Sequence, residues 1–163
     1  MKPFTKLLIV FSLTIVFTIS SCHQEKDVKK TEKTYNKEDF QLVKSAILNY
    51  VDGLYLVDST KIDKSVDKKL RKIGYWYNPD KKQYVDNLEM TYQQLSNLAA
   101  KWNKSGKSVN ENSPKEIEIF DVNSKTASAK LTAEWGIDLF HLAKVNNQWK
   151  IINVIWQSQP KEK

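Results

Sequence analysis

The stretch from Pro114 to Gln157 contains four strand-like runs separated by turn residues, and it constrains the fold more than any other part of the chain. The runs cover 115–121, 126–135, 137–144 and 149–156. Short runs joined by turns predict an antiparallel meander. The second run alternates polar and apolar residues, whereas the last two are apolar on both faces. Such a sheet needs helices over one face and a different cover over the other.

The first 21 residues have the pattern of an export signal. Lys2 and Lys6 flank the start of a mostly apolar stretch of 13 residues, 7–19. A membrane-spanning helix needs about 20 residues, so this length is typical of a secretory signal. The stretch ends in Ile19-Ser20-Ser21-Cys22, which resembles the bacterial lipobox. The resemblance implies that Cys22 is lipidated and anchors the protein in the cell envelope, at the outer membrane. An ordinary cleaved signal or an uncleaved anchor is the alternative.

Residues 22–35 form a highly charged segment with almost no apolar side chains. We expect this segment to be a disordered tether between the lipid anchor and the folded domain. Its early glutamine and acidic residues resemble surface-export signals of some Bacteroidetes lipoproteins. Interleaved lysines favour the plain tether instead. The folded domain is expected over 36–158, followed by a tail at 159–163.

The composition limits the partners and cofactors that the chain can use. Residues 22–163 number 142 (163 minus 21), which suits one domain. The net charge of +7 falls to +5 when Lys2 and Lys6 leave with the signal. Because the lysines are scattered among acids, nucleic acid is not expected as a partner. The four glycines lie too far apart for a phosphate-binding loop, and neither a metal nor another cofactor is expected.

Apolar periodicity predicts two helices at the start of the domain. The first runs from about 37 to 56 and begins at Asn36, with Asp39 near its N-terminal dipole. The second is short and begins at Asp58. Its apolar side chains, Ile62, Val66 and Leu70, recur at i, i+4 and i+8.

A hairpin and a third helix lead to the meander. The hairpin strands are expected at 71–77 and 83–88. Thr91 and Gln94 have the spacing of a capping box, which marks the start of the third helix. Helices packed on one face of an antiparallel sheet make an α+β fold.

Several segments resemble the nuclear transport factor 2-like superfamily. Residues 46–55 with Asp58 are similar to a helix motif of that superfamily, and the segments 118–130, 138–144 and 149–153 resemble its putative lumazine-binding (SnoaL-like) branch. The resemblance covers about 40–157. It implies a cone-shaped, cystatin-like fold in which three N-terminal helices pack on a curved antiparallel sheet. Val154 departs from the pattern, because members of the branch often carry a lysine there.

The predicted register of the last hairpin indicates two candidate catalytic residues. If Asn146 and Asn147 form a two-residue turn, Phe140 pairs with Asn153, and Asp138 lies diagonally from Asn153. A carboxylate among apolar side chains could act as an acid or base, as the resemblance to ketosteroid isomerase and scytalone dehydratase implies. The alternative, which we favour, is a structural Asp138 bonded to backbone or Asn153. His141 is a proton shuttle on one hypothesis and a structural histidine on the favoured one.

Aromatic residues indicate a ligand cavity between helices and sheet, although ordinary core packing is the alternative. The candidate lining residues are Tyr50, Tyr55, Trp76, Trp102, Trp135, Phe140 and Asn153. Alanines on one strand would leave room for the cavity: Ala127, Ala129 and Ala133. The other sheet face would carry Ile137, Leu139, His141, Ala143, Ile152, Val154 and Trp156.

Three functions remain open at this point. The leading hypothesis is non-catalytic binding of a small apolar or aromatic ligand in the cavity. One alternative is a small enzyme that performs acid–base chemistry, of the isomerase or dehydratase kind, with Asp138. The other is an interaction module that forms a homodimer through the second sheet face.

Overall fold

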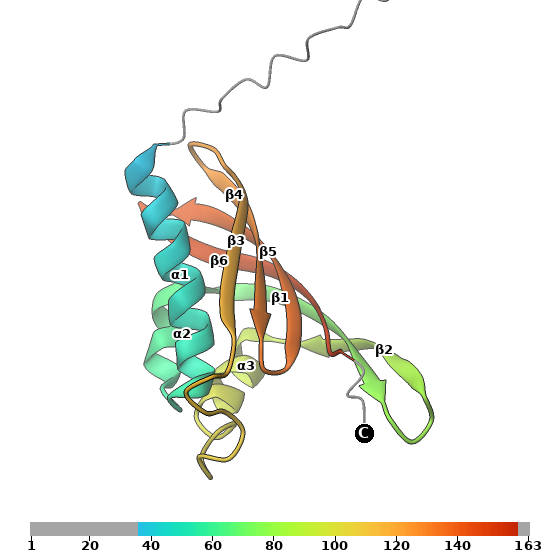
Figure 1. The fold of residues 1–163 in the computed structure, drawn as a ribbon. Helices are drawn as coiled ribbons and strands as arrows, with labels where there is room; N and C mark the ends of the chain where they lie inside the picture. Colours follow the sequence, from blue (N-terminus) through green and yellow to red (C-terminus); the bar gives the residue numbers. More distant parts are fainter. Residues whose placement is uncertain (1–35, 160–163) are drawn as a thin grey trace, which may run out of the picture. The chain divides into compact units, whose positions relative to one another are not determined.

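The computed structural model describes residues 36–159 (Figure 1). The expected signal at 1–21, the expected lipidation of Cys22, the expected tether and the residues beyond Gln159 lie outside the described residues. The elements are α1 (Lys37–Tyr55), α2 (Ser59–Ser65), β1 (Val66–Asn78), β2 (Gln83–Met90), α3 (Tyr92–Ala99), β3 (Lys115–Val122), β4 (Thr126–Ala133), β5 (Gly136–Val145) and β6 (Gln148–Gln157). None of the helices among these residues is long and apolar enough to cross a membrane.

The strands form one six-stranded sheet in the order β2-β1-β6-β5-β4-β3. The antiparallel meander β3–β6 and the β1–β2 hairpin agree with the sequence analysis. The expectation of a wholly antiparallel sheet is wrong, because β1 pairs with β6 in parallel. The hairpin therefore extends the meander instead of standing apart from it. Figure 1 shows α1 and α2 on one side of the sheet.

Helix α2 is shorter than the apolar spacing predicted. It ends at Ser65, and Val66 and Leu70 belong to β1. Both side chains are buried all the same, because residues four apart lie on the same face of a strand as well as of a helix. Spacing alone could not distinguish the two conformations here.

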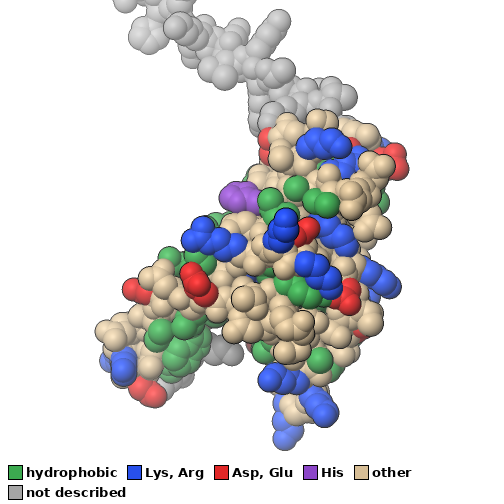
Figure 2. All heavy atoms as spheres, turned by 180° about the vertical axis from the view of Figure 1, so that it is seen from behind, with side chains coloured by type: hydrophobic (Ala, Val, Ile, Leu, Met, Phe, Trp, Pro, Cys, Tyr) green, Lys and Arg blue, Asp and Glu red, His purple; other side chains and the backbone are tan. Residues whose placement is uncertain are grey.

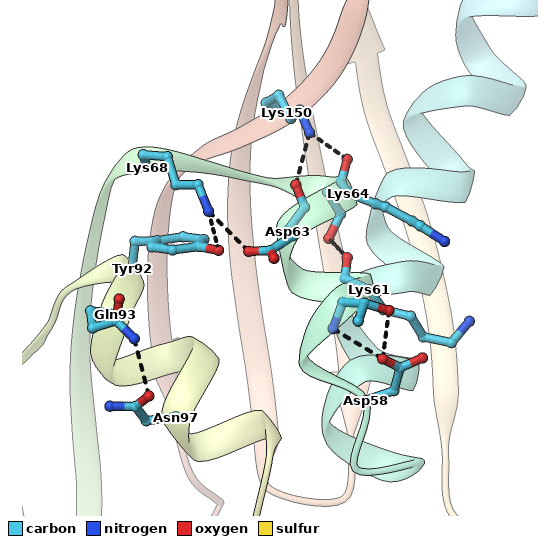
Figure 3. Close-up of polar contacts among 11 residues, drawn as sticks. Asp58, Lys61, Asp63, Lys64, Lys68, Tyr92, Gln93, Asn97 and Lys150 are labelled. Carbon is cyan, nitrogen blue, oxygen red and sulfur yellow. Dashed lines mark hydrogen bonds and ion pairs between the residues drawn. The ribbon is translucent and has the colours of Figure 1, made fainter.

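The ends of the helices are held by side chains. Asp58 accepts a hydrogen bond from the Thr60 amide at 3.0 Å, which caps the start of α2. At the other end of α2, the Lys150 ammonium donates to the carbonyls of Asp63 (3.0 Å) and Lys64 (2.6 Å), where the helix dipole favours a cation (Figure 3).

The capping box predicted for α3 is present. The Thr91 amide donates to the Gln94 side chain at 2.7 Å, and the Gln94 amide donates to the Thr91 hydroxyl at 3.3 Å. The start of this helix could therefore be read from two residues.

The core lies between α1 and the inner face of the sheet. It includes Ile47, Tyr50, Val51, Leu131, Phe140, Leu142 and Ile151, each at most 1% exposed. At the start of α1, the Asp39 carboxylate accepts hydrogen bonds from the Lys144 ammonium (2.6 Å) and the Trp149 indole (2.8 Å). These two bonds lower the pKa of Asp39 and join α1 to β5 and β6.

A β-bulge changes the faces predicted for β6. Leu142 pairs with Ile151 as expected, but the next pair is His141 with Asn153, so Ile152 is the extra residue. Phe140 therefore pairs with Val154, and the predicted pair of Phe140 with Asn153 is wrong. Beyond the bulge, the side chains of β6 exchange faces. Val154 is fully buried on the inner face, and Ile155 is exposed on the outer one.

The outer face of the sheet carries apolar side chains among charged ones (Figure 2), and Leu139 and Ile155 are cross-strand neighbours there. Leu139, Ile152 and Ile155 are between 38% and 45% exposed. Figure 2 also shows hydrophobic side chains gathered over the β1–β2 hairpin, whose exposed members are Trp76, Tyr84, Val85 and Leu88.

Candidate functional site: an aromatic cleft beside a buried lysine

A cleft of about 750 Å³ opens beside four tryptophans from distant parts of the chain. Trp76 lies on β1, Trp102 follows α3, Trp135 lies in the turn between β4 and β5, and Trp156 lies on β6. Lys107, Ser108, Glu134 and Ser158 contribute polar groups to its rim. The indole rings of Trp102 and Trp135 meet edge to face with centroids 5.4 Å apart. Indole faces so arranged can hold a planar apolar molecule.

A second, smaller cavity of about 110 Å³ lies beside the cleft, and we call it the inner cavity because buried Tyr50 and Lys72 line it. The two spaces share Trp102, Trp135 and Trp156 as walls. Most of the inner lining is apolar, from Leu54, Met90, Leu95 and Leu98, and its polar side chains are Tyr50 and Lys72. A group of a ligand that reaches past these three tryptophans would meet Lys72.

Lys72 is a candidate site residue that was not predicted from the sequence pattern. Its ammonium donates to Oδ1 of Asp138 at 3.0 Å and to the Tyr50 hydroxyl at 2.8 Å. The Trp135 indole donates to the other oxygen of Asp138 at 2.8 Å. The side chains of Lys72 and Asp138 are 6% and 0% exposed, so the ion pair is buried. The predicted contact of Asp138 with Asn153 is wrong, because Asn153 lies beyond the bulge and donates to the backbone of Arg71.

Burial changes the pKa of two residues in this cluster, Lys72 and Tyr50. It lowers the pKa of Lys72, while the charge of Asp138 and the hydrogen bond to it act in the opposite direction. Burial also raises the pKa of Tyr50 well above its usual value, and the charge of Asp138 adds to that rise. Tyr50 is therefore a neutral phenol at physiological pH.

A simple signal could have found Lys72. Leu70, Lys72 and Gly74 alternate along β1 on one face, so the strand period points the lysine inward with Leu70. The predicted helix through Leu70 hid that period. Lys72 also pairs with Val154 across β1 and β6.

Gly74 and Trp156 are matched to each other across the same two strands. A Cβ atom on Gly74 would lie 1.8 Å from Nε1 and 1.9 Å from Cε2 of the Trp156 indole. The Trp156 indole therefore lies directly over Gly74, where only a glycine leaves room for it. In this position the indole forms a wall of both the cleft and the inner cavity. Its Nε1 is buried without a hydrogen-bond acceptor among the described residues.

The predicted pocket residues divide into two groups. Tyr50, Trp76, Trp102 and Trp135 line the two spaces. Tyr55, Phe140 and Asn153 do not. The Tyr55 hydroxyl instead joins two segments, because it donates to the Pro114 carbonyl and accepts from the Glu134 amide, both at 2.8 Å.

Phe140 and two of the three alanines belong to the core behind the cleft. Phe140 packs edge to face on Tyr50 with centroids 5.1 Å apart. Ala127 and Ala129 are also buried away from the lining, whereas Ala133 lines the cleft. Most of the space that the small side chains leave is therefore filled by protein.

Asp138 and His141 lie on opposite faces of β5. Asp138 is fully buried behind Lys72, and His141 is exposed on the outer face. Neither residue is among those that line the cleft or the inner cavity. Within 36–159, no three His, Cys, Asp or Glu side chains come close enough together to hold a metal ion.

Comparisons with known proteins identify the fold. A family model described as "Putative lumazine-binding" matches residues 38–157. A nuclear transport factor 2-like protein of unknown function from Silicibacter pomeroyi has a TM-score of 0.56 at 11% identity, over 77% of this chain and 99% of that one.

Two further solved structures agree. A nuclear transport factor 2-like protein from Shewanella baltica has a TM-score of 0.52 at 17% identity, over 78% and 99% of the two chains. A protein with a cystatin-like fold from Nostoc punctiforme has a TM-score of 0.50 at 9% identity, over 77% and 94%. No curated protein sequence matches the chain. At these identities the structural similarity concerns the fold, which agrees with the α+β fold expected from the sequence.

Proposed function

The chain belongs to the putative lumazine-binding family, within the nuclear transport factor 2-like superfamily, and from this premise we propose that it binds a small planar, mostly apolar ligand without transforming it. The cleft walled by Trp76, Trp102, Trp135 and Trp156 carries this proposal. Four indoles from four separate segments converge on this open cleft. Tryptophans that serve only to fill the core would not leave such an opening between them. Exposed aromatic surface of this kind is costly to leave in water and is suited to stacking on a ligand.

The buried ion pair favours binding over acid–base catalysis. Both oxygens of Asp138 are occupied, one by Lys72 and one by Trp135, and the carboxylate stands outside the lining of the cavities. A general base must reach the proton that it removes. In the enzyme alternative, Asp138 acts as the general acid or base. An Asp138→Asn variant that retains full activity on an identified substrate would rule out that alternative.

A thermal-shift titration tests the proposal. We expect planar bicyclic and tricyclic aromatic compounds to raise the melting temperature of the full-length protein, because a ligand that binds only the folded state stabilises it by mass action. At about 100 times the dissociation constant the gain is ~2.7 kcal/mol, which corresponds to a shift on the order of 5–10 °C.

Two variants, each lacking one exposed apolar side chain, show whether the ligand binds in the cleft. Trp76→Ala, in the cleft, should reduce the shift, whereas Leu139→Ala, on the outer face, should leave it unchanged; the two side chains are 43% and 45% exposed. Equal shifts in both variants, or no shift with any compound, would contradict binding in the cleft.

We also propose that Cys22 anchors the protein by lipidation. This is supported by its position as the only cysteine, directly after the apolar export segment. Cells fed a radioactive or clickable fatty acid should label the wild-type protein and not a Cys22→Ser variant, which should leave the membrane fraction. Labelling of both forms would show that the lipid is attached elsewhere. Labelling of neither form would show that the protein is not lipidated.

The outer sheet face remains a candidate homodimer interface. Leu139, Ile152 and Ile155 form its apolar part, and Val154 and Trp156, which the sequence analysis assigned to it, are on the inner side. A strictly monomeric mass in solution at high protein concentration would argue against this role.

A further inference from the structure

We infer that the ligand carries an uncharged hydrogen-bond acceptor, such as a ketone or lactam carbonyl, at the end that enters the inner cavity, and that the Lys72 ammonium donates to it. This inference rests on the proposed function and specifies the chemistry of the ligand. It is carried by the position, burial and hydrogen bonds of Lys72.

The hydrogen bonds of Lys72 leave one donor available. An ammonium has three N–H donors. Two of them are directed to Asp138 and to Tyr50, at 3.0 and 2.8 Å. The third has no acceptor among residues 36–159, although the side chain is 6% exposed and lines the inner cavity. A buried donor without a partner is costly, so an acceptor that enters the cavity gains the bond that the protein does not supply.

The charges around Lys72 favour a neutral acceptor over an anion. The positive charge is already balanced by Asp138, so an entering carboxylate would add an unbalanced negative charge near that residue. The Lys72 nitrogen also lies 5.5 and 5.3 Å from the ring centroids of Tyr50 and Trp156. The negative faces of such rings stabilise a cation and disfavour an anion.

The size of the inner cavity limits what can enter it. A volume of about 110 Å³ holds a few non-hydrogen atoms, since one water molecule occupies ~30 Å³ in the liquid. The acceptor therefore belongs to a small group that projects from the ligand, such as a carbonyl oxygen, and the larger planar part lies in the cleft beside the tryptophans. The ketone oxygen of a fused aromatic ring system fits this description.

Three probes that share the tricyclic fluorene frame and differ in the group at carbon 9 separate the effects. Fluorene has no acceptor, 9-fluorenone has a neutral ketone, and fluorene-9-carboxylate has an anion. We expect the full-length protein to bind 9-fluorenone roughly 10- to 100-fold more tightly than fluorene in calorimetric titrations, because hydrogen bonds to charged groups are worth about 1.5–3 kcal/mol. Fluorene is the more hydrophobic of these two compounds, so desolvation alone predicts the opposite order. The carboxylate should bind more weakly than the ketone.

A variant without the ammonium should abolish the preference. Because removing Lys72 alone leaves Asp138 unpaired, the variant is the double substitution Lys72→Met with Asp138→Asn. Its affinity for 9-fluorenone should exceed its affinity for fluorene by no more than about twofold, or ~0.4 kcal/mol, or should fall below it, because fluorene is the more hydrophobic compound. If that variant fails to fold, the relative affinities of the wild-type protein for the three probes still test whether the ligand needs a neutral acceptor.

The possible outcomes separate this inference from the proposed function. Equal affinity of the wild-type protein for fluorene and 9-fluorenone, or tighter binding of the carboxylate, would overturn the role of Lys72 and leave the aromatic cleft standing. Binding of none of the three probes would overturn the proposed function and this inference together.

Discussion

Replacing Lys72 with methionine is expected to lower the free energy of unfolding by about 3–5 kcal/mol, although methionine fits the apolar surroundings. The loss arises because Asp138 would remain fully buried without its counter-ion, 3.0 Å from where the ammonium was. The Tyr50 hydroxyl would lose its donor at the same time. Urea unfolding at neutral pH measures the effect as a change in the midpoint at constant slope.

Two further variants identify the cause of that loss. Lys68→Met removes another lysine from β1, but the Lys68–Asp63 pair has side chains 69% and 55% exposed, so the expected cost is below ~1 kcal/mol. The double variant Lys72→Met with Asp138→Asn removes both charges and should recover most of the stability. A single Lys72→Met variant as stable as the Lys68→Met control would contradict a buried ion pair at this site.

Substituting Gly74 with alanine is expected to damage both the fold and the cleft. The new Cβ would lie 1.8 Å from Nε1 of the Trp156 indole, which is closer than two such atoms can approach, so the indole must move. Overpacking of this kind costs typically about 1–3 kcal/mol and occasionally more. Because Trp156 is a wall of both cavities, its displacement should also weaken binding of 9-fluorenone at least ~10-fold, a loss of ~1.4 kcal/mol.

The damage to the fold and the damage to the cleft can be separated. Combining Gly74→Ala with Trp156→Val removes the clash, so the double variant should be more stable than the sum of the two single losses predicts. Binding should not return, because the indole wall is gone. A Gly74→Ala protein with unchanged melting temperature and unchanged affinity would show that the indole does not lie over the glycine.

The elements with local signals could be predicted from the sequence. Thr91 and Gln94 specify the start of α3 because each satisfies a backbone amide of the other. The last hairpin was predictable up to Leu142 and Ile151, because its Asn146-Asn147 turn sets the register. Both asparagines adopt positive φ values, of 47° and 61°, as a two-residue hairpin turn requires.

The features that depend on contacts between distant segments could not be predicted in the same way. The bulge at Ile152 reverses the faces of the following residues, and because β6 is apolar on both faces its sequence fits either register. The parallel pairing of β1 with β6 joins segments about 80 residues apart, for which the sequence has no local signal. The site depends on both features, since they bring Lys72, Trp156 and Asp138 together.

This dependence explains why the pocket was predicted only in part. Trp102 and Trp135 were identified by their aromatic character alone. Trp156 was assigned to the opposite face because the bulge was not foreseen. Lys72 was overlooked because an inward lysine becomes evident only when the strand around it is known.

The five tryptophans provide the most direct test of the aromatic cleft. Four of them line it, whereas the indole of Trp149 is buried elsewhere and donates to Asp39 at 2.8 Å. In a nuclear magnetic resonance titration of the full-length protein with 9-fluorenone, the indole N–H signals of Trp76, Trp102, Trp135 and Trp156 should move, and that of Trp149 should stay. A titration in which Trp149 moves as far as the other four, or in which no indole signal moves, would contradict a ligand site in the cleft.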